Sequence, residues 1–141
     1  MSCTAMPHGP WTEEPDRLAG FTAAGFAYLI TRHVLMGHLI GLVAIPTTHP
    51  LYGVDYRNLA DISVHGGLSF SGPREDHCHA FLELVRQSAW WVGFHCAHAG
   101  DRCPIILGSG VYRDMAFVKA EVDSLANQLA DRASVNVGPS R

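Results

Sequence analysis

The stretch DMAFVKAEVDSLANQLADR, residues 114–132, decides the fold. Its apolar side chains recur at spacings of three and four, the repeat of one face of an α-helix. Asp114 is suited to cap the N-terminus of that helix, and a Gly-Pro pair follows soon after Arg132. About 18 residues at 1.5 Å each give roughly 27 Å, the width of a small domain. We therefore predict a long C-terminal helix over 114–132 whose apolar stripe packs on a sheet. The stripe comprises Met115, Val118, Val122, Leu125 and Leu129.

The sheet is expected in the segments that precede this helix. Ala89–Ala97, with two tryptophans and a phenylalanine, is the clearest strand. Apolar residues in 26–36 and in Leu39–Ile45 predict a hairpin joined by a tight turn. Ile62–Phe70 alternates weakly and predicts a further strand with a bulge at Gly66-Gly67. The fold class is therefore α+β, with a small, mainly antiparallel sheet of about four strands packed against the long helix.

The remaining segments are expected to be less regular. Residues 1–20 are rich in Pro, Gly and acidic groups and predict an irregular N-terminal arm anchored by Trp11. Residues 47–61 predict a loop, and residues 72–89 a short helix or loop insert. At 141 residues the chain fits a single domain, 1–141, with one hydrophobic core.

Composition excludes several classes of partner. Charged residues make up only 16% of the chain and the net charge is −3, so nucleic acid is not expected as a partner. The most apolar run, Val34–Pro46, is interrupted by His38 and is shorter than the roughly 20 residues that cross a bilayer. The four cysteines form no C-x-x-C pair and no signal peptide precedes them, which favours a cytoplasmic protein with reduced thiols.

The first motif with chemical potential is Val64-His65-Gly66-Gly67. Two glycines after a histidine would let a ligand approach the backbone, whose N–H groups can receive anions or carbonyl oxygens. The competing interpretation, favoured for so short a motif, is a bulged strand end with His65 bonded to a neighbouring carbonyl.

The second motif is HCAHAGD, residues 95–101. At the end of a strand, His95 and Cys96 would point to opposite faces of the sheet, with His98 and Asp101 in the turn that follows. A histidine–carboxylate pair in a turn can orient a general base or bind a ligand, and in an enzyme His98 and Asp101 would be the catalytic residues. Asp101 could equally cap the local backbone.

The third motif is Tyr112-Arg113-Asp114, at the start of the long helix. Helix N-termini attract anions, and Arg113 would add a bidentate donor for phosphate or carboxylate. Ordinary capping by Asp114 with a surface ion pair of Arg113 is the competing interpretation. Tyr52 and Trp90 could stack on a planar ligand, although such aromatics are more often part of the core.

A metal site is a further alternative. The weak candidate ligands are His95, Cys96, His98 and Cys103, with His65, Asp101 and the cluster Asp76-His77-Cys78-His79 as additional donors. Zinc suits such residues, but none of their spacings matches a standard zinc signature. The sequence therefore implies no cofactor firmly and leaves zinc open.

Five strings together are similar to a family of small bacteriophage, prophage and bacterial proteins that is largely uncharacterised. They are GPWTEEPD (9–16), HPLYGVDY (49–56), VHGGLSFSG (64–72), WWVGFHCAHAGD (90–101) and YRDMAFVKAEVDSLANQLA (112–130), and they cover nearly the whole chain. That family usually carries Asp at the position of His95 and a longer insert in place of 73–88. The resemblance implies an accessory phage-type protein in the host cytoplasm, and such proteins often act against host defence.

Three functions from different classes follow. In the first, His65, Gly66, Gly67, His98, Asp101, Tyr112 and Arg113 line a pocket for a small polar, nucleotide-like ligand, such as a host defence signal held by the protein. In the second, His98 and Asp101 activate water, with or without a metal. A protein–protein inhibitor that uses Tyr52, Tyr56 and the helix is a third. Because no catalytic signature is present, we favour binding. Ala116, Ala120, Ala126 and Ala130 widen the apolar arc of the helix, so a homodimer or higher homo-oligomer stays open.

Overall fold

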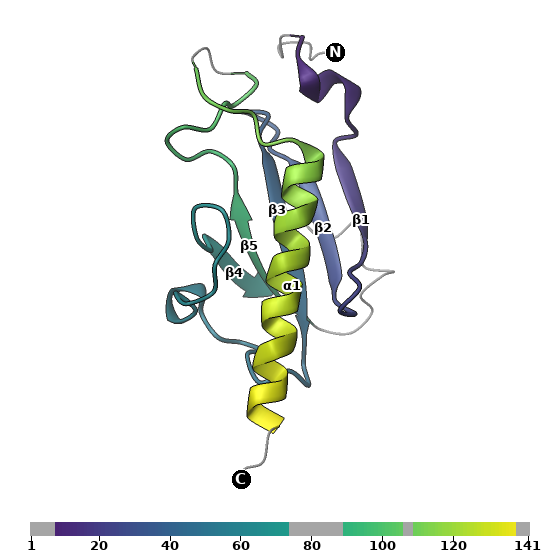
Figure 1. The fold of residues 1–141 in the computed structure, drawn as a ribbon, viewed down its shortest axis with the longest axis vertical. Helices are drawn as coiled ribbons and strands as arrows, with labels where there is room; N and C mark the ends of the chain where they lie inside the picture. The colour runs from purple at the N-terminus through teal and green to yellow at the C-terminus, as the bar shows by residue number, and fades with distance from the viewer. Residues whose placement is uncertain (1–7, 74–88, 106–108, 138–141) are drawn as a thin grey trace.

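The computed structural model describes residues 8–73, 89–105 and 109–137. In these residues an antiparallel five-stranded sheet carries one long helix on one face (Figure 1). The strand order is β1-β2-β3-β5-β4. The elements are β1 (Arg17–Phe21), β2 (Ala27–Arg32), β3 (Leu39–Pro46), β4 (Phe70–Pro73), β5 (Ala89–His95) and α1 (Met115–Val137), with short 3-10 helices at Pro10–Glu13 and Tyr56–Asn58. The α+β class is confirmed, with one strand more than expected.

The core lies between α1 and the sheet face it covers. The apolar stripe of α1 is fully buried at Val118, Val122, Leu125 and Leu129, as its periodicity predicts. Gly41 in β3 makes the close contact possible, because a Cβ there would lie 2.7 Å from the Phe94 ring and 3.0 Å from Val122. The opposite face of the sheet carries a smaller apolar cluster of Ala27, Leu29, Leu42, Ala44 and Trp91.

Four of the expected elements are confirmed. The hairpin of β2 and β3, the strand β5 and the helix α1 lie where the sequence predicts, although α1 extends to Val137. Asp114 caps α1 as expected, since its Oδ1 accepts a hydrogen bond of 2.8 Å from the N–H of Phe117. The predicted short helix or loop over 72–89 falls on 74–88, which lie outside the described residues.

The N-terminal arm is more ordered than its composition indicates. Arg17–Phe21 forms β1, an edge strand paired with β2, which corrects the prediction of an irregular arm over 1–20. A tight turn creates the pairing: the N–H of Thr22 donates to the carbonyl of Phe26 at 2.8 Å, and Gly25 supplies a φ of 95°. Trp11 is buried and anchors the arm, as expected.

The segment 62–70 is a loop over most of its length, which corrects the predicted bulged strand. Its backbone binds side chains of α1 instead of a neighbouring strand. Gln128 accepts from the N–H of Ser63 at 2.8 Å and donates to its carbonyl at 2.8 Å. Ile62 and Val64 are buried in the core beneath the helix, so the apolar alternation reflects loop packing. Regular pairing begins only at Phe70, in β4.

Among the described residues, no helix combines the length and the apolar character needed to cross a bilayer.

Candidate functional site

The three polar motifs meet at the carboxylate of Asp101, whose side chain is 1% exposed. His65 Nε2 lies 2.8 Å from Oδ2 and 3.0 Å from Oδ1. Arg113 Nε donates to Oδ1 at 2.8 Å, and the backbone N–H of His98 donates to Oδ2 at 3.0 Å. The loop after β5, the double-glycine turn and the segment that leads into α1 therefore converge on one buried acid.

Local backbone pairing brings these segments together. The N–H of Asp101 donates to the carbonyl of His98 at 2.9 Å, which closes a turn directly after β5. Asp101 then pairs with Val111 in a short parallel bridge, two residues before Arg113. On the opposite side, Glu121 of α1 accepts from the backbone N–H of His65 at 2.7 Å.

The electrostatic balance keeps Asp101 ionised. Burial acts to raise the pKa of this carboxyl, but the hydrogen bonds from Arg113, His65 and the His98 backbone outweigh it, so the pKa lies below its ordinary value. A carboxylate that accepts from three groups has little capacity left for a ligand. Asp101 therefore acts first as a clamp that holds three loops.

The histidine that pairs with this clamp is His65, and the expected side-chain pair of His98 with Asp101 is not formed. His98 reaches the carboxylate only through its backbone. Its ring stacks on His95, with centroids 4.4 Å apart, and its buried Nε2 has no hydrogen-bond partner among the described residues.

Gly66 makes room for the His98 ring. A Cβ at Gly66 would overlap His98 Nε2, whereas a Cβ at Gly67 would meet no atom within 4 Å. Both glycines have positive φ, 72° and 84°, in a turn closed by the N–H of Gly67 and the carbonyl of Val64 at 2.8 Å. The double glycine thus serves a turn and a ring contact rather than the expected strand bulge.

Five imidazoles form a continuous row through this region, which we call the imidazole row. Successive ring centroids lie 4.7 Å apart for His33–His38, 5.9 Å for His38–His95, 4.4 Å for His95–His98 and 5.7 Å for His98–His65. Sequence reasoning missed His33 and His38. The available signal was the antiparallel pairing of β3 with β5, which sets Ile40 opposite His95 and so brings the β2–β3 turn beside the end of β5.

Two members of the row are neutral near pH 7. Burial, with the neighbouring His33 and His95 rings, lowers the pKa of His38 to about 4. Burial, with the adjacent His98, also lowers the pKa of His95. Neutral imidazoles offer one hydrogen-bond donor and one acceptor each, and they carry no charge to attract an anion.

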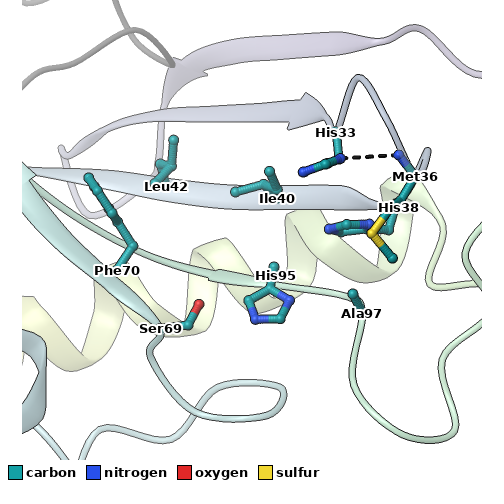
Figure 2. A pocket seen from close by; sticks show the side chains of 9 residues that line it. All are labelled: His33, Met36, His38, Ile40, Leu42, Ser69, Phe70, His95 and Ala97. Carbon is teal, nitrogen blue, oxygen red and sulfur yellow. Dashed lines mark hydrogen bonds between the residues drawn. The ribbon is translucent and has the colours of Figure 1, made fainter.

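A groove of about 350 Å³ opens beside this row, on the sheet face opposite α1 (Figure 2). His33, Met36 and His38 lie at one end and Phe70 at the other, with Ile40 and His95 between them. Leu42, Ser69 and Ala97 complete the lining. The groove therefore combines an apolar floor with imidazole walls, the pattern of small-molecule sites.

The expected anion site at the start of α1 is occupied by the protein itself. The N–H of Met115 donates to Glu14 at 2.9 Å, and that of Phe117 donates to Asp114. Arg113 is bound to Asp101 through Nε, and its guanidinium lies 5.1 Å from the Phe117 ring centroid. The two terminal nitrogens of Arg113 have no hydrogen-bond partner among the described residues.

Tyr112 belongs to the anchor of the N-terminal arm rather than to the site. Its hydroxyl donates to Glu14 at 2.6 Å and accepts from buried Arg32 at 3.0 Å, and its ring meets Trp11 edge-on with centroids 5.0 Å apart. Burial, with the nearby Glu14, raises its pKa.

Tyr52 and Trp90 lie away from the imidazole row. Their ring centroids are 6.4 Å apart, and the Trp90 indole donates to the carbonyl of Val54 at 2.8 Å. Trp90 stands five residues before His95 in β5, which is about 16 Å along a strand. The two aromatics therefore cannot stack on a ligand that also contacts His95.

The cysteines and histidines do not form a metal centre in the part of the chain that is described. No group of three or more His, Cys, Asp or Glu side chains there could hold a metal ion. Cys96 faces the core under α1, opposite to His95, and burial raises the pKa of its thiol to about 12. Cys103 lies 3.8 Å from His38 Nδ1. The cluster 76–79 is outside the described residues.

Comparison with models of protein families, with curated proteins and with solved structures finds no match to this chain.

Proposed function

We propose that this protein binds a small polar, nucleotide-like ligand in the groove of Figure 2 and holds it without chemical change. The observation that supports this most is the lining of the groove, in which apolar side chains and the hydrogen-bonding rings of His33, His38 and His95 share one cavity of about 350 Å³. That volume lies within the range of small-molecule pockets. Sequestration of a host defence signal is one role that an accessory phage-type protein of the kind this chain resembles could have.

The arrangement around Asp101 supports binding more than hydrolysis. A carboxylate that orients a histidine is typical of general-base sites, and His65–Asp101 is such a pair. Asp101 is also neutralised by Arg113, which weakens its support for a protonated His65 during catalysis. The described residues include no Ser, Thr or Cys side chain hydrogen-bonded to His65 that could act as a nucleophile. Hydrolysis with His65 and Asp101 is our second candidate. This candidate requires that the protein release a hydrolysis product and that His65→Ala abolish this release.

Mass spectrometry of protein purified without chelators tests the proposal. We expect one organic molecule released intact on denaturation, in a fixed ratio to protein, and no metal in that ratio. In Ile40→Trp, which fills the groove, the retained amount should fall at least tenfold. Phe21→Trp on the exposed edge strand is the matched control and should keep the ligand. Equal retention by both variants, or a modified product in place of an intact ligand, would contradict the proposal.

A further inference from the structure

We infer that the groove recognises an uncharged, planar nitrogen heterocycle, of the class of a nucleoside base, and not a phosphate or other anion. This inference rests on the proposed function and names the part of the ligand that the groove binds. It is carried by the position of three imidazoles around an apolar floor, and by the absence of basic side chains from the described lining of the groove.

The first step concerns the hydrogen bonds that the groove can offer. His33 Nδ1 accepts from the backbone N–H groups of Leu35 and Met36, both at 3.1 Å. Because Nδ1 accepts, the proton of the ring is on Nε2, which presents a donor, and Figure 2 shows this second nitrogen on the side of the ring away from the Met36 N–H. His95 forms no hydrogen bond with any described residue through its ring, so both its nitrogens are open to a ligand. A base edge, with adjacent donors and acceptors, matches this set.

The second step concerns charge. None of the nine lining residues is Lys or Arg. The buried guanidinium of Arg32 is paired with Asp16 at 2.8 Å and with Glu14 at 3.7 Å, and Arg113 is paired with Asp101. The lowered pKa values of His38 and His95 agree with an uncharged wall. A phosphate placed here would lose its hydration without gaining a counter-charge.

The third step concerns shape. His33 and His38 are stacked with an interplanar angle of 17°, and His95 and His98 with one of 25°. Ile40, Leu42 and Phe70 supply apolar surface along the floor. Stacking of a base on aromatic rings is tolerant of base identity and contributes about 1–3 kcal/mol in nucleic-acid-binding proteins. A flat heterocycle fits between these surfaces better than a tetrahedral group.

Calorimetric titration of the ligand-stripped protein at pH 7.5 tests the inference with four nucleosides, their 5′-monophosphates and inorganic phosphate. We expect at least one nucleoside to bind with a Kd within about tenfold of that of its monophosphate, with no heat from phosphate alone. His95→Leu should weaken that nucleoside at least tenfold. His33→Asn, at the half-buried turn, is the second variant in case His95→Leu fails to fold. His8→Ala, on the exposed arm, is the control.

The outcomes separate the inference from the proposed function. A monophosphate that binds more than a hundredfold tighter than its nucleoside, or phosphate that binds alone, would overturn the inference and leave a groove that binds ligands. Zinc or nickel that binds stoichiometrically and loses affinity in His95→Leu would also overturn it. If no nucleoside, nucleotide or retained molecule binds at all, the proposed function fails as well.

Discussion

At the scale of single residues, His38 is the group whose protonation matters most for stability. Its side chain is buried, stacked on His33, tilted against His95 and 3.8 Å from Cys103 Sγ. The pKa of about 4 in the fold lies below the ordinary value of 6.5, so between these pH values the unfolded chain binds a proton that the folded protein does not. Stability is therefore present above pH 6.5 and is lost as the pH falls towards 4.

The first prediction is a fall of about 3 kcal/mol in the free energy of unfolding between pH 7 and pH 4, to which the lowered pKa of His95 adds in the same direction. Urea denaturation across this range measures it. His38→Phe keeps a ring in the stack and removes the proton site, so its curve should be flatter. The attribution to His38 fails if the variant loses as much stability on acidification as the parent protein.

Asp101 is the second residue with a large expected effect. Asp101→Asn removes a buried charge that accepts from three donors. The NH2 of the new amide is itself a donor, so it would face a donor of Arg113 or His65 without forming a hydrogen bond. We expect a loss of about 2–3 kcal/mol, below the full value for a buried pair because Arg113 and His65 reach solvent. Asp123→Asn, which breaks the exposed pair with Lys119, should cost less than about 0.5 kcal/mol and is the control. Similar midpoints of thermal unfolding for both variants would contradict the role of Asp101 in holding the three loops together.

At the scale of elements, the turn 64–67 makes the sharpest prediction. Gly66→Ala and Gly67→Ala both place a Cβ at positive φ, which costs about 1–2 kcal/mol. Only Gly66→Ala also displaces the His98 ring, and with it the stack on His95. We expect Gly66→Ala to be destabilised further and to lose ligand, while Gly67→Ala keeps it. The carbon-bound ring-proton signals of the histidines in NMR spectra report the displacement directly.

Elements with strong periodicity could be predicted from the sequence, and elements that depend on partners could not. In the α1 stripe and in the β2, β3 and β5 segments, the apolar pattern alone indicates the type of secondary structure. β1 has the weak pattern RLAGF and becomes a strand because a tight turn sets it beside β2. The segment 62–70 has a strand-like pattern, but Gln128 and Glu121 of α1 take its backbone hydrogen bonds.

The meeting of the three motifs at Asp101 was predictable but its pairings were not, and the groove was not predicted, since His95 alone among its lining residues was a candidate site residue in the sequence. The convergence of the motifs on Asp101 follows from polar residues placed where a strand ends and a helix begins. The identity of the paired histidine does not, because it depends on the local turn geometry, in which the backbone of His98 and not its ring meets the carboxylate. His33 and His38 join the row only through the register of β3 on β5, which spans more than fifty residues of sequence.

At the scale of the whole molecule, the outer face of α1 bears on oligomeric state. Ala126 is buried against the sheet and unavailable to a partner, while Ala116 and Ala120 are exposed. A homodimer through α1, which the sequence leaves open, would therefore rest on the first two turns of the helix. Light scattering at micromolar concentration should give twice the monomer mass, and Ala120→Arg should restore the monomer mass. A monomer mass for the unsubstituted protein would rule out the dimer. It would not affect the groove, which lies on the other side of the sheet.

The contact between Glu14 and the first turn of α1 links residues 101 positions apart. During synthesis the acid leaves the ribosome long before the helix that it caps, so this contact can form only after α1 has been made. An N-terminal fragment would expose the apolar sheet face, and a C-terminal fragment would carry a helix start with one cap missing. Neither half should fold alone, and the two mixed together should regain structure only as a complex.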